Sequence, residues 1–594
     1  MPPFSKILVA NRGEIAIRVF RTLRELGIGS VAVYSEADRA ALHVRTADEA
    51  YLIGAAAPAE SYLDGERIIE TARRAGAGAI HPGYGFLAEN ASFARLCEEA
   101  GIVWIGPPPE AIEAMGSKVE ARRLMVKAGV PVIPGTTDPV ETAEELVRLG
   151  DEYGWPVAVK ASAGGGGKGL KVVASPEEAE RALASARREG EAYFSDPTVY
   201  VEKLIPDPRH VEVQVLADAH GNAVHLGERD CTIQRRHQKL VEETPSPAVS
   251  PELRARIGEI ALEAARAVGY RGAGTIEGLL DPDGSYYFLE MNTRIQVEHT
   301  ITELVTGIDL VREQILVAAG EPLGFKQSEI AFRGHAIECR INAEDAANGF
   351  LPAPGTITAY REPAGPGIRV DSGVEAGSEI SATYDPMVAK LCAWDTDRER
   401  ARRRMLRALE EFVVEGVTTL VGFHRALLEH RCFVDGTTCH GLVESEELAQ
   451  RSQELSHAAT TVARAPDGAL RGRTVPVELE SRRYDVTVLE PEPPHAALAR
   501  RRRERSPIVG GAHATAKEAV VSPMQGTVLA VEVSDGDEVE AGRVLCVVEA
   551  MKMENEIRAH RDGVVTGLSV TPGDSVSTGQ VICVVSSDGA GPDS

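Results

Sequence analysis

Polar and apolar side chains alternate between residues 290 and 298, and this pattern offers the clearest chemistry in the sequence. The polar positions carry carboxylates, amides and a guanidinium: Glu290, Asn292, Arg294, Gln296 and Glu298. If the stretch is extended, these side chains point the same way, with roughly 6.6 Å between neighbours. Together with Glu277 on an earlier predicted strand, they offer the oxygen ligands that magnesium–phosphate sites need. A solvent-exposed strand face is the alternative.

A run of four glycines, followed by lysine and glycine, occupies residues 164–169. It lies between a predicted buried strand that carries Lys160 and a second predicted strand from Leu170 to Ala174. Glycines let backbone N–H groups approach a phosphate closely, although ordering such a run costs conformational entropy. The run lacks the Gly-Lys-Ser/Thr ending of a P-loop. A flexible linker is the alternative, but a mobile lid over a nucleotide fits the flanking strands better.

Three stretches between the glycine run and the polar strip suit a nucleotide. Residues 199–205 place two charged side chains among apolar ones, as expected where an adenine ring and its polar edge are held. Residues 210–215 alternate strictly, so their polar side chains share one strand face. Residues 228–239 surround one cysteine with five cationic or imidazole side chains, which suit ATP phosphates and bicarbonate. A solvated sheet face and an ordinary surface loop are the alternatives for the last two stretches.

A second chemical site is predicted at Lys552, which has a methionine on either side. It lies between two halves of an internal repeat that begin at Gly526 and Gly563. The same residue types recur in register: Gly526, Gly536, Asp537, Val539, Gly542, Val544, Cys546 and Val548 match Gly563, Gly573, Asp574, Val576, Gly579, Val581, Cys583 and Val585. Short valine-rich runs between glycine turns predict strands, and two such halves predict a flattened β-sandwich. A lysine at its hairpin tip suits covalent attachment, whereas most lysines are only solvated surface groups.

The elements expected around the polar strip and the glycine run predict an α/β framework. A strand at residues 7–10, a helix from Ile15 to about Leu26 and a strand at residues 30–34 imply a parallel sheet covered by helices. Residues 81–90 form a Gly/Pro-rich loop that leads into a helix, and a purely structural turn is the alternative. No Gly-x-Gly-x-x-Gly follows the first strand, so a dinucleotide site is not expected. Strand-like residues 334–345 and a helix from Asp397 to about Phe412 predict a smaller α/β lobe.

Composition and charge exclude several functions. The chain has 594 residues and a formal net charge of −25, which argues against a nucleic-acid partner. No run of about 18 apolar residues indicates a membrane span, and no signal-type segment is expected at the start. The eight cysteines are scattered, without Cys-x-x-Cys spacing. We therefore expect them to be reduced and not metal-binding, and the protein to be cytoplasmic, without a membrane or nucleic-acid partner.

These motifs resemble those of known families. The glycine run, Arg-Arg-His-Gln-Lys at 235–239 and the polar strip resemble ATP-grasp enzymes and, specifically, biotin carboxylase. The decamer at 81–90 is typical of the N-terminal domain of biotin carboxylases, so the similarity covers about residues 4–445. The C-terminal repeat, with Ala-Met-Lys-Met at 550–553, resembles the biotinyl (biotin carboxyl carrier) domain. In lipoyl carrier domains the lysine usually has Asp before it and Ala after it, so the two methionines favour biotin.

The resemblance implies a role for each group of residues. ATP contacts are expected from Lys118, Lys160, Gly165, Gly166, Lys168, Gly169, Glu202, Lys203, Leu204, His210, Gln234, His237, Glu277 and Glu290. Lys168 stands where some relatives have Arg, which keeps the charge. Two Mg²⁺ or Mn²⁺ sites are expected, with ligands Glu277, Glu290 and Asn292. Bicarbonate is expected at Lys239, Arg294, Gln296, Val297 and Glu298.

The implied catalytic residues are Glu298, Arg294, Arg340 and Lys239. Glu298 would remove the bicarbonate proton, so that bicarbonate attacks the γ-phosphate of ATP and gives carboxyphosphate. Arg340 would stabilise the enolate of biotin, because a permanent cation suits a developing oxyanion. The structural alternative for Arg340 is an ion pair with Glu338, which shares its strand face. Biotin itself is expected to be covalently bound to Lys552.

The predicted fold is multidomain, α/β and α+β, with an ATP-grasp biotin carboxylase followed by an all-β flattened biotinyl sandwich. The expected parts are a parallel α/β N-terminal domain (1–115), an ATP-grasp domain (116–335) with a lid at about 132–204, a C-terminal domain (336–450), a linker with a small β element (451–515), the carrier domain (516–587) and a tail (588–594). Pro-rich and Arg-rich segments predict that the linker is a mobile tether. The arginine run at 500–505 could bind nucleic acid in isolation, but on an acidic chain a tether or a partner-docking segment is favoured.

We therefore expect the α-chain of an acyl-CoA carboxylase of the acetyl- or propionyl-CoA type. It would carboxylate its own biotin with ATP and bicarbonate and deliver it to a separate carboxyltransferase β-chain, making malonyl-CoA or methylmalonyl-CoA for fatty-acid or polyketide synthesis. Biotin protein ligase is a further expected partner, and a homo-oligomer within an α/β complex is expected. The alternatives are a split pyruvate carboxylase, a non-catalytic biotinyl scaffold, and an ATP-grasp ligase that joins a carboxylate to an amine. The last of these leaves Lys552 unexplained.

Overall fold

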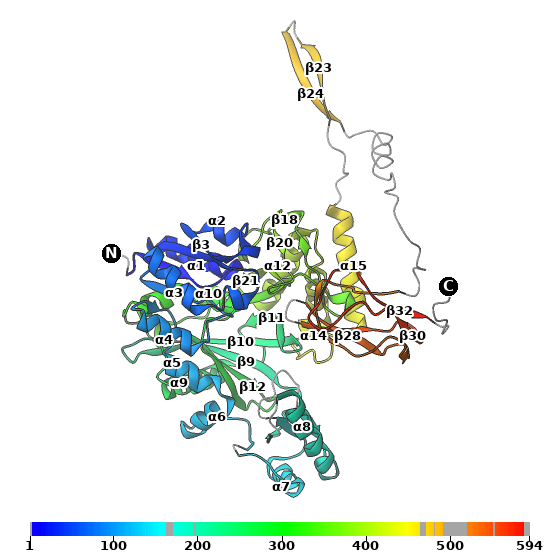
Figure 1. Cartoon of the computed structure of the whole chain (residues 1–594). Coiled ribbons are helices and arrows are strands. Elements are labelled where there is room, and N and C mark those ends of the chain that lie inside the picture. The colour runs from blue at the N-terminus through cyan, green and yellow to red at the C-terminus, as the bar shows by residue number, and fades with distance from the viewer. Residues whose placement is uncertain are drawn as a thin grey trace. The chain divides into compact units, whose positions relative to one another are not determined.

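The computed structural model describes residues 3–136, 138–161, 170–194, 198–463, 471–479, 482–490, 519–550 and 553–586. They belong to two compact units, Met1–Gln453 and Glu454–Ser594, which are described separately (Figure 1). The glycine run with Gly165, Gly166, Lys168 and Gly169 lies outside the described residues, and so does Lys552. None of the described helices has the length and hydrophobicity that a membrane span requires.

The first unit begins with a five-stranded sheet of order β3-β2-β1-β4-β5, in which all neighbouring strands are parallel. Its strands are β1 (Lys6–Val9), β2 (Gly29–Ser35), β3 (Glu49–Gly54), β4 (Ala79–His81) and β5 (Val103–Trp104). Its helices are α1 (Gly13–Leu26), α2 (Leu42–Thr46), α3 (Gly65–Ala75), α4 (Ala91–Glu99) and α5 (Pro109–Gly116). Helix α1 ends at Gly27, whose φ of 69° favours glycine. The predicted parallel sheet is confirmed.

An eight-stranded sheet of order β13-β12-β9-β10-β11-β14-β21-β19 follows, and its neighbouring strands are antiparallel. The strands are β9 (Arg209–Ala217), β10 (Ala223–Arg235), β11 (Gln238–Thr244), β12 (Gly272–Leu280), β13 (Tyr286–Asn292), β14 (His335–Asn342), β19 (Ile368–Ser372) and β21 (Met387–Asp395). Helices α9 (Pro251–Ala267), α10 (His299–Thr306) and α11 (Leu310–Ala318) belong to the same region. The expected domain division between residues 335 and 336 falls within β14, and β14 pairs with β11 in this sheet. The two regions therefore share one continuous sheet.

The region predicted as a lid has a three-stranded sheet of its own, with order β7-β6-β8. It contains α7 (Ala143–Tyr153), β6 (Val157–Ala161), β7 (Leu170–Val173), α8 (Ala179–Phe194) and β8 (Val199–Lys203), after α6 (Lys118–Lys127). A separate apolar cluster, which includes Leu146, Val159 and Val201, holds these elements together. Strands therefore flank the glycine run on both sides, as predicted.

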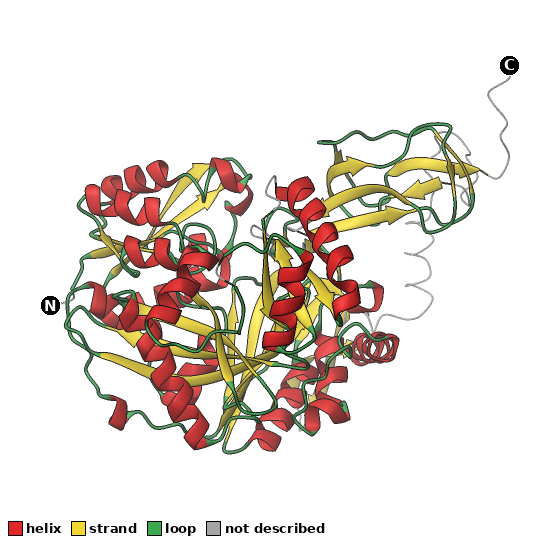
Figure 2. Cartoon of the chain, turned by 90° about the horizontal axis from the view of Figure 1, so that it is seen from below, coloured by secondary structure: helices red, strands yellow, loops and turns green. Residues whose placement is uncertain are grey.

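Figure 2 shows helices lying over the strands of the first unit. In the C-terminal lobe, short strands and helices accompany β14, β19 and β21. The strands are β15 (Glu344–Asp345), β16 (Leu351–Pro352), β17 (Gly355–Thr356), β18 (Ala359–Arg361), β20 (Glu379–Ile380) and β22 (Val413–Glu415). The helices are α12 (Arg398–Glu411), α13 (Val421–Glu429), α14 (Arg431–Val434) and α15 (Glu446–Ala463), which crosses the division between the units.

The expectation that all eight cysteines are reduced is wrong. Cys432 and Cys439 form a disulfide, because α14 and the turn after it bring their Cα atoms to 5.6 Å. The remaining cysteines are free and buried: Cys97, Cys231, Cys339, Cys392, Cys546 and Cys583.

The second unit contains the predicted β-sandwich. A separate antiparallel pair, β23 (Arg471–Leu479) and β24 (Arg482–Glu490), precedes it, as expected for the small β element. The sandwich strands are β25 (Ala519–Val521), β26 (Gly526–Val531), β27 (Glu538–Val539), β28 (Val544–Ala550), β29 (Met553–Arg558), β30 (Gly563–Thr566), β31 (Ser575–Val576) and β32 (Val581–Ser586). They form two four-stranded sheets, β25-β32-β30-β27 and β29-β28-β26-β31.

The two sequence repeats exchange strands between these sheets. The first repeat gives β26 and β28 to one sheet and β27 to the other, and the second gives β30 and β32 to one sheet and β31 to the other. This exchange accounts for the matched residue types in the two halves. Ala550 pairs with Met553 where β28 turns into β29. Lys552 lies between these two strands in the sequence but outside the described residues, so its place at a hairpin tip stays a prediction.

Candidate active site

The Nζ of Lys239 is the point at which the predicted site residues meet. It donates to Glu212, to Oε1 of Glu277 at 2.8 Å and to Oε1 of Glu298 at 2.7 Å. An ammonium group has three N–H donors, so each donor has one carboxylate acceptor. Burial alone would lower the pKa of Lys239, but Glu212 and Glu298 raise it well above its usual value. The site therefore holds a permanent cation at its centre.

Glu298 lies at the N-cap of α10, directly before the helix, and only 2% of its side chain is exposed. Its Oε2 accepts from Nη2 of Arg340 at 2.8 Å, while its Oε1 accepts from Lys239. Burial alone would raise the pKa of Glu298, but Lys239 and Arg340 lower it well below its usual value. The structure thus presents a buried carboxylate anion between two cations, which is the state that a base requires.

Arg340 lies on β14 and faces β11. Its Nε donates to Oε1 of Glu242 at 2.6 Å, and the same guanidinium binds Glu298. Glu338, the alternative partner expected from the sequence, instead accepts from Thr300 on α10. Arg340 is therefore bound to the predicted base rather than to its own strand neighbour.

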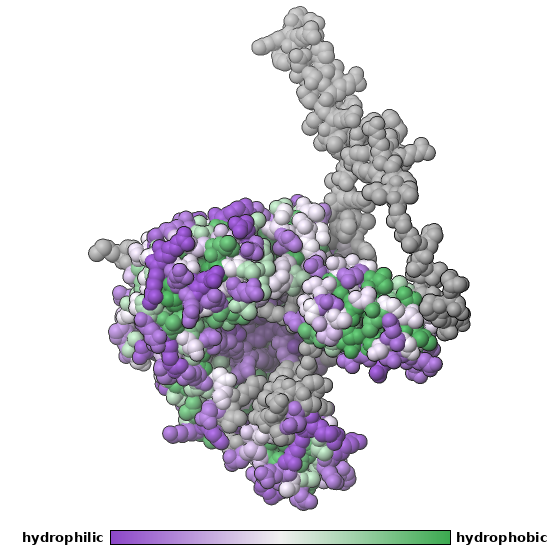
Figure 3. All heavy atoms as spheres, in the orientation of Figure 1, coloured by the Kyte–Doolittle hydropathy of each residue, from purple (hydrophilic) through white to green (hydrophobic). Residues whose placement is uncertain are grey.

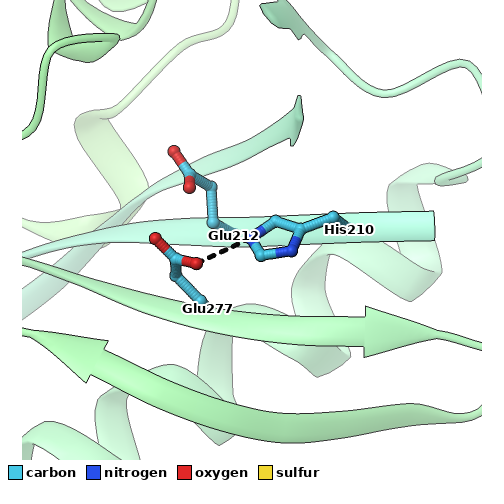
Figure 4. A group of neighbouring side chains, drawn as sticks. All are labelled: His210, Glu212 and Glu277. Atoms are coloured by element: carbon cyan, nitrogen blue, oxygen red, sulfur yellow. Dashed lines mark ion pairs between the residues drawn. The ribbon is translucent and has the colours of Figure 1, made fainter. Parts of the chain in front are cut away.

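The predicted metal ligands come together at the pairing of β12 with β13. Glu277 and Glu290 stand directly opposite each other in the strand register, and Nδ2 of Asn292 donates to Oε1 of Glu277 at 2.8 Å. Nε2 of His210 lies 2.7 Å from Oε2 of Glu277, with Glu212 beside them (Figure 4). Two carboxylates and an amide supply hard oxygen donors, so the residues present fit Mg²⁺ or Mn²⁺.

His210, Glu212 and Gln214 share one face of β9, as predicted, but this face is not solvated. Glu212 and Gln214 are completely buried, and His210 points toward Glu277. The atoms of His210, Glu212 and Glu277 that could ligate a cation lie within 4.8 Å of one another. The alternating strand therefore lines the site beside the metal ligands.

The shared face expected if residues 290–298 are extended is wrong. Strand β13 ends at Asn292, and the chain then turns through a loop into α10. Nη2 of Arg294 donates to Oδ1 of Asn292 at 2.8 Å, and Nε2 of Gln296 donates to Glu277 at 2.6 Å. The loop thus brings the predicted residues together, whereas a straight strand would spread them along one face.

The predicted ATP contacts are distributed over the lid region, α6 and strand β10 of the main sheet. Lys160 on β6 pairs with Glu202 on β8, and Lys203 ends β8, with Leu204 next to it. Lys118 is the first residue of α6. Nε2 of Gln234 donates to the carbonyl of Cys231 at 2.7 Å.

His237 lies with Arg236 at the two-residue tip of the β10–β11 hairpin. Their φ values of 66° and 47° are both positive, a conformation that costs energy for residues with a Cβ and that is found at functional sites. His237 is exposed at this tip, whereas the imidazole of His210 pairs with the buried Glu277. The two predicted histidines therefore lie in different environments.

Several residues that position the site were not singled out by their motifs. Glu89 accepts from Nε of Arg294 at 2.9 Å and from the backbone of Thr293 at 2.9 Å. It belongs to the decamer at 81–90, which could have indicated it. Lys390 is completely buried and donates to the Val297 carbonyl at 3.0 Å. A lone lysine in an apolar strand was the available signal.

The surface of the first unit is hollowed and hydrophilic between the N-terminal elements and the lid (Figure 3). A polar hollow of this kind suits charged substrates such as ATP and bicarbonate, whose phosphate and carboxylate oxygens need donors and cations.

Comparison with known proteins identifies this arrangement. Residues 3–112 match "Biotin carboxylase, N-terminal domain", residues 117–326 match "Carbamoyl-phosphate synthase L chain, ATP binding domain", residues 338–445 match "Biotin carboxylase C-terminal domain", and residues 518–587 match "Biotin-requiring enzyme". The biotin-dependent acyl-coenzyme A carboxylase alpha3 subunit of Mycobacterium leprae is 45% identical over 94% of this chain and 95% of its own length. The chain belongs to the biotin carboxylases that carry a C-terminal biotinyl domain.

Other biotin carboxylases match the first unit alone. A pyruvate carboxylase subunit of Methanothermobacter thermautotrophicus is 58% identical over 73% of this chain and 88% of its own length. The crystal structure of the biotin carboxylase domain dimer of Hydrogenobacter thermophilus 2-oxoglutarate carboxylase, with MgADP and bicarbonate, is 49% identical. It covers 74% of this chain and 99% of that chain, with a TM-score of 0.69.

This biotin carboxylase is therefore a ligase. It carries out the ATP-dependent carboxylation of biotin within a biotin-dependent carboxylase, and its C-terminal sandwich is a biotin carrier domain. The fold class, the family and the enzyme class predicted from the sequence are confirmed.

Proposed function

We propose that this biotin carboxylase is the cytoplasmic α-subunit of an acyl-CoA carboxylase. It carboxylates biotin on its own Lys552 and delivers the carboxybiotin to a separate carboxyltransferase β-chain. The products are malonyl-CoA or methylmalonyl-CoA, for fatty-acid or polyketide synthesis. The observation that carries the catalytic part is the buried Glu298 carboxylate, which is held between Lys239 and Arg340.

In the first step, Glu298 takes the proton of bicarbonate. The bicarbonate is held by the side chains of Lys239, Arg294 and Gln296 and by the Val297 backbone. The freed oxygen attacks the γ-phosphorus of ATP, the bond to the β–γ bridging oxygen breaks, and carboxyphosphate and ADP result. Because phosphoryl transfer depends on position and charge, the side chains of Lys118, Lys160, Lys168 and His237 contribute by neutralising phosphate oxygens.

Glu277, Glu290 and Asn292 would hold the divalent metal. It supplies charge neutralisation and orientation of the ATP phosphates when it is bound. Lys239 donates to the Glu277 carboxylate, and Nε2 of His210 lies 2.7 Å from it, so both side chains help to hold this carboxylate in place.

In the second step, the carboxyl group of carboxyphosphate is transferred to a ureido nitrogen of biotin, and phosphate leaves. The nitrogen gives its proton to the departing phosphate, and negative charge develops on the ureido oxygen. Arg340 is the fixed cation for that charge, because its guanidinium already faces the site and bears two buried carboxylate partners, Glu242 and Glu298. A closed lid would keep water from carboxyphosphate.

The second unit carries the biotin to and from this site. Lys552, at the β28–β29 connection, is the proposed attachment residue, and biotin protein ligase is the partner that forms its amide bond. Residues 451–515 are the proposed tether. The related domain in Hydrogenobacter thermophilus is described as a dimer, which supports a homo-oligomer of the first unit within an α/β complex.

The choice of an acyl-CoA rests on the relative that matches both units. The Mycobacterium leprae protein, an alpha3 subunit of an acyl-coenzyme A carboxylase, is similar over 94% of this chain. The similarity to the pyruvate carboxylase of Methanothermobacter thermautotrophicus is confined to 73% of it. The carboxylation of biotin is the same reaction whichever molecule later accepts the carboxyl group. The first unit alone therefore favours neither substrate, whereas the full-length match favours an acyl-CoA.

The acceptor is tested by assaying the α-chain, reconstituted with its co-purifying β-chain, on acetyl-, propionyl- and butyryl-CoA and on pyruvate. We expect at least tenfold higher kcat/KM with acetyl- or propionyl-CoA than with pyruvate. The formation of oxaloacetate from pyruvate at the higher rate would instead assign the chain to a split pyruvate carboxylase.

A substitution of Arg340 tests the proposed enolate role. Loss of one preorganised electrostatic donor typically lowers kcat about 10²- to 10³-fold, and we expect that loss for Arg340→Ser in the carboxylation of free biotin. The affinity for ADP should change less than twofold. Arg398→Ser is the matched control, because Arg398 also pairs with a buried β11 carboxylate, Glu243, at 2.6 Å. Equal losses in the two variants would contradict a catalytic role for Arg340.

A further inference from the structure

Arg229 is a buried guanidinium next to the proposed bicarbonate site, but it does not belong to the residues that line it. It lies on β10, its side chain is completely buried, and it is among the largest fully buried side chains of the described residues. A charge in that position is costly unless all of its donors are bound. Its partners therefore indicate what the buried charge does.

All five N–H donors of Arg229 have a side-chain acceptor. Nε donates to Glu212 at 2.5 Å, Nη1 to Gln214 at 2.7 Å and Thr302 at 3.0 Å, and Nη2 to Thr275 at 3.2 Å and Gln296 at 2.7 Å. These acceptors come from β9, from β12, from α10 and from the loop between β13 and α10. One planar group thus connects the strands, the helix and the loop that surround this side of the proposed bicarbonate site.

The bond to Gln296 decides which end of that amide faces the site. Because Oε1 of Gln296 accepts from Arg229, its Nε2 must point the other way, and it lies 2.6 Å from Glu277. The reversed amide would place an NH₂ group against a guanidinium, donor against donor. An anion such as bicarbonate needs donors, so Arg229 holds Gln296 in the orientation that can bind it.

The bond to Glu212 connects Arg229 with Lys239 as well. One oxygen of Glu212 accepts from Nε of Arg229, and the other accepts from Lys239. Arg229 thereby fixes the carboxylate that accepts a hydrogen bond from the Lys239 ammonium group. Both donors on this side of the bicarbonate site depend on the same buried guanidinium.

We infer that Arg229 is a positioning residue of the bicarbonate site, acting through Gln296 directly and through Lys239 by way of Glu212. The inference rests on the proposed function, because it requires that Gln296 and Lys239 bind bicarbonate. It assigns Arg229 no contact with substrate. Its loss should therefore weaken bicarbonate binding selectively and leave the nucleotide site intact.

The first test measures bicarbonate-dependent ATP hydrolysis by the full chain with free biotin. Arg229→Lys keeps the charge but offers only three donors for five acceptors. We expect the KM for bicarbonate to rise at least tenfold, while the KM for ATP changes less than twofold. In a Gln296→Ala background, Arg229→Lys should raise the bicarbonate KM less than threefold, since the amide it orients is gone.

A matched threonine pair keeps the inference testable if Arg229→Lys fails to fold. Thr275→Val removes an acceptor of Nη2, the nitrogen that holds Gln296, whereas Thr302→Val removes an acceptor of Nη1, which keeps Gln214. We expect the bicarbonate KM to rise two- to fivefold for Thr275→Val and to stay within 1.5-fold for Thr302→Val.

The outcomes separate this inference from the proposed function. If the wild-type chain hydrolyses ATP at a rate independent of bicarbonate, the proposed function is wrong, and the inference falls with it. If the wild type depends on bicarbonate but Arg229→Lys raises the KM values for bicarbonate and ATP equally, only the inference is overturned. Equal effects of Thr275→Val and Thr302→Val would overturn it as well, because a purely structural role predicts that equality.

Discussion

The Glu298→Gln variant is expected to bind ADP with wild-type affinity and to lose biotin carboxylation by about three orders of magnitude. General-base catalysis contributes about 10²- to 10⁴-fold, and a glutamine at this position cannot take the bicarbonate proton. The substitution keeps the size of the side chain and leaves Lys239 and Arg340 with their other carboxylate partners. Isothermal titration with ADP and a coupled assay of ADP release with free biotin measure the two quantities.

Glu243→Gln is the matched control for this experiment. Glu243 is a buried glutamate that accepts from Arg398 at 2.6 Å and lies 2.8 Å from Nε2 of His335, so it is also a buried carboxylate with two side-chain partners. Breaking a buried ion pair costs about 3–5 kcal/mol in either case, so both variants lose stability. Only Glu298→Gln should lose catalysis beyond that common effect. Carboxylation at the wild-type rate by folded Glu298→Gln would refute the assigned base.

The Lys552→Arg variant is expected to abolish acyl-CoA carboxylation by the α/β complex and to leave the carboxylation of free biotin within twofold of wild type. Arginine keeps the positive charge but cannot be joined to biotin by the amide bond that the ligase forms. The first unit, with Glu298 and Arg340, is unchanged, so its own chemistry should persist. Streptavidin blotting, together with the two activity assays, checks all three expectations.

Lys326→Arg serves as the control, since Lys326 is an exposed lysine of the first unit outside the proposed site. It should retain biotin and both activities. Biotin found on the Lys552→Arg chain, or acyl-CoA carboxylation by that chain, would show that another residue carries the cofactor.

Prediction of the structure from the sequence succeeded best where a regular repeat of residue types determines the local fold. The strict alternation at 210–215 determined which side chains of β9 face the site, and the two C-terminal repeats indicated the sandwich, because each repeat contributes equivalent strands. The match of residue types at 235–239 and 290–298 indicated the ATP-grasp site without any knowledge of distances.

The predictions failed where the chain changes direction or where distant elements meet. The alternation of polar and apolar residues suggested an extended chain up to Glu298, but the strand ends at Asn292, and residues 293–298 form the loop that leads into α10. Arg340 pairs with Glu242 of β11 and not with Glu338 of its own strand. Strand pairing places Glu242 opposite Glu338, so Glu242 lies diagonally across from Arg340 on the neighbouring strand. The five hydrogen bonds of Arg229 reach four separate segments of the chain. The spacing of residues along the sequence does not reveal that these segments lie together.

The central claim is that this chain carboxylates the biotin on its own Lys552. The most direct test incubates the biotinylated full-length chain with MgATP and ¹⁴C-bicarbonate, in the absence of a β-chain and of free biotin, and then counts the label on the gel-filtered protein. The account predicts ATP-dependent labelling that approaches about one carboxyl group per biotin and that is lost in both Glu298→Gln and Lys552→Arg. Label on the Lys552→Arg chain, or no label on a wild-type chain that carboxylates free biotin, would contradict it.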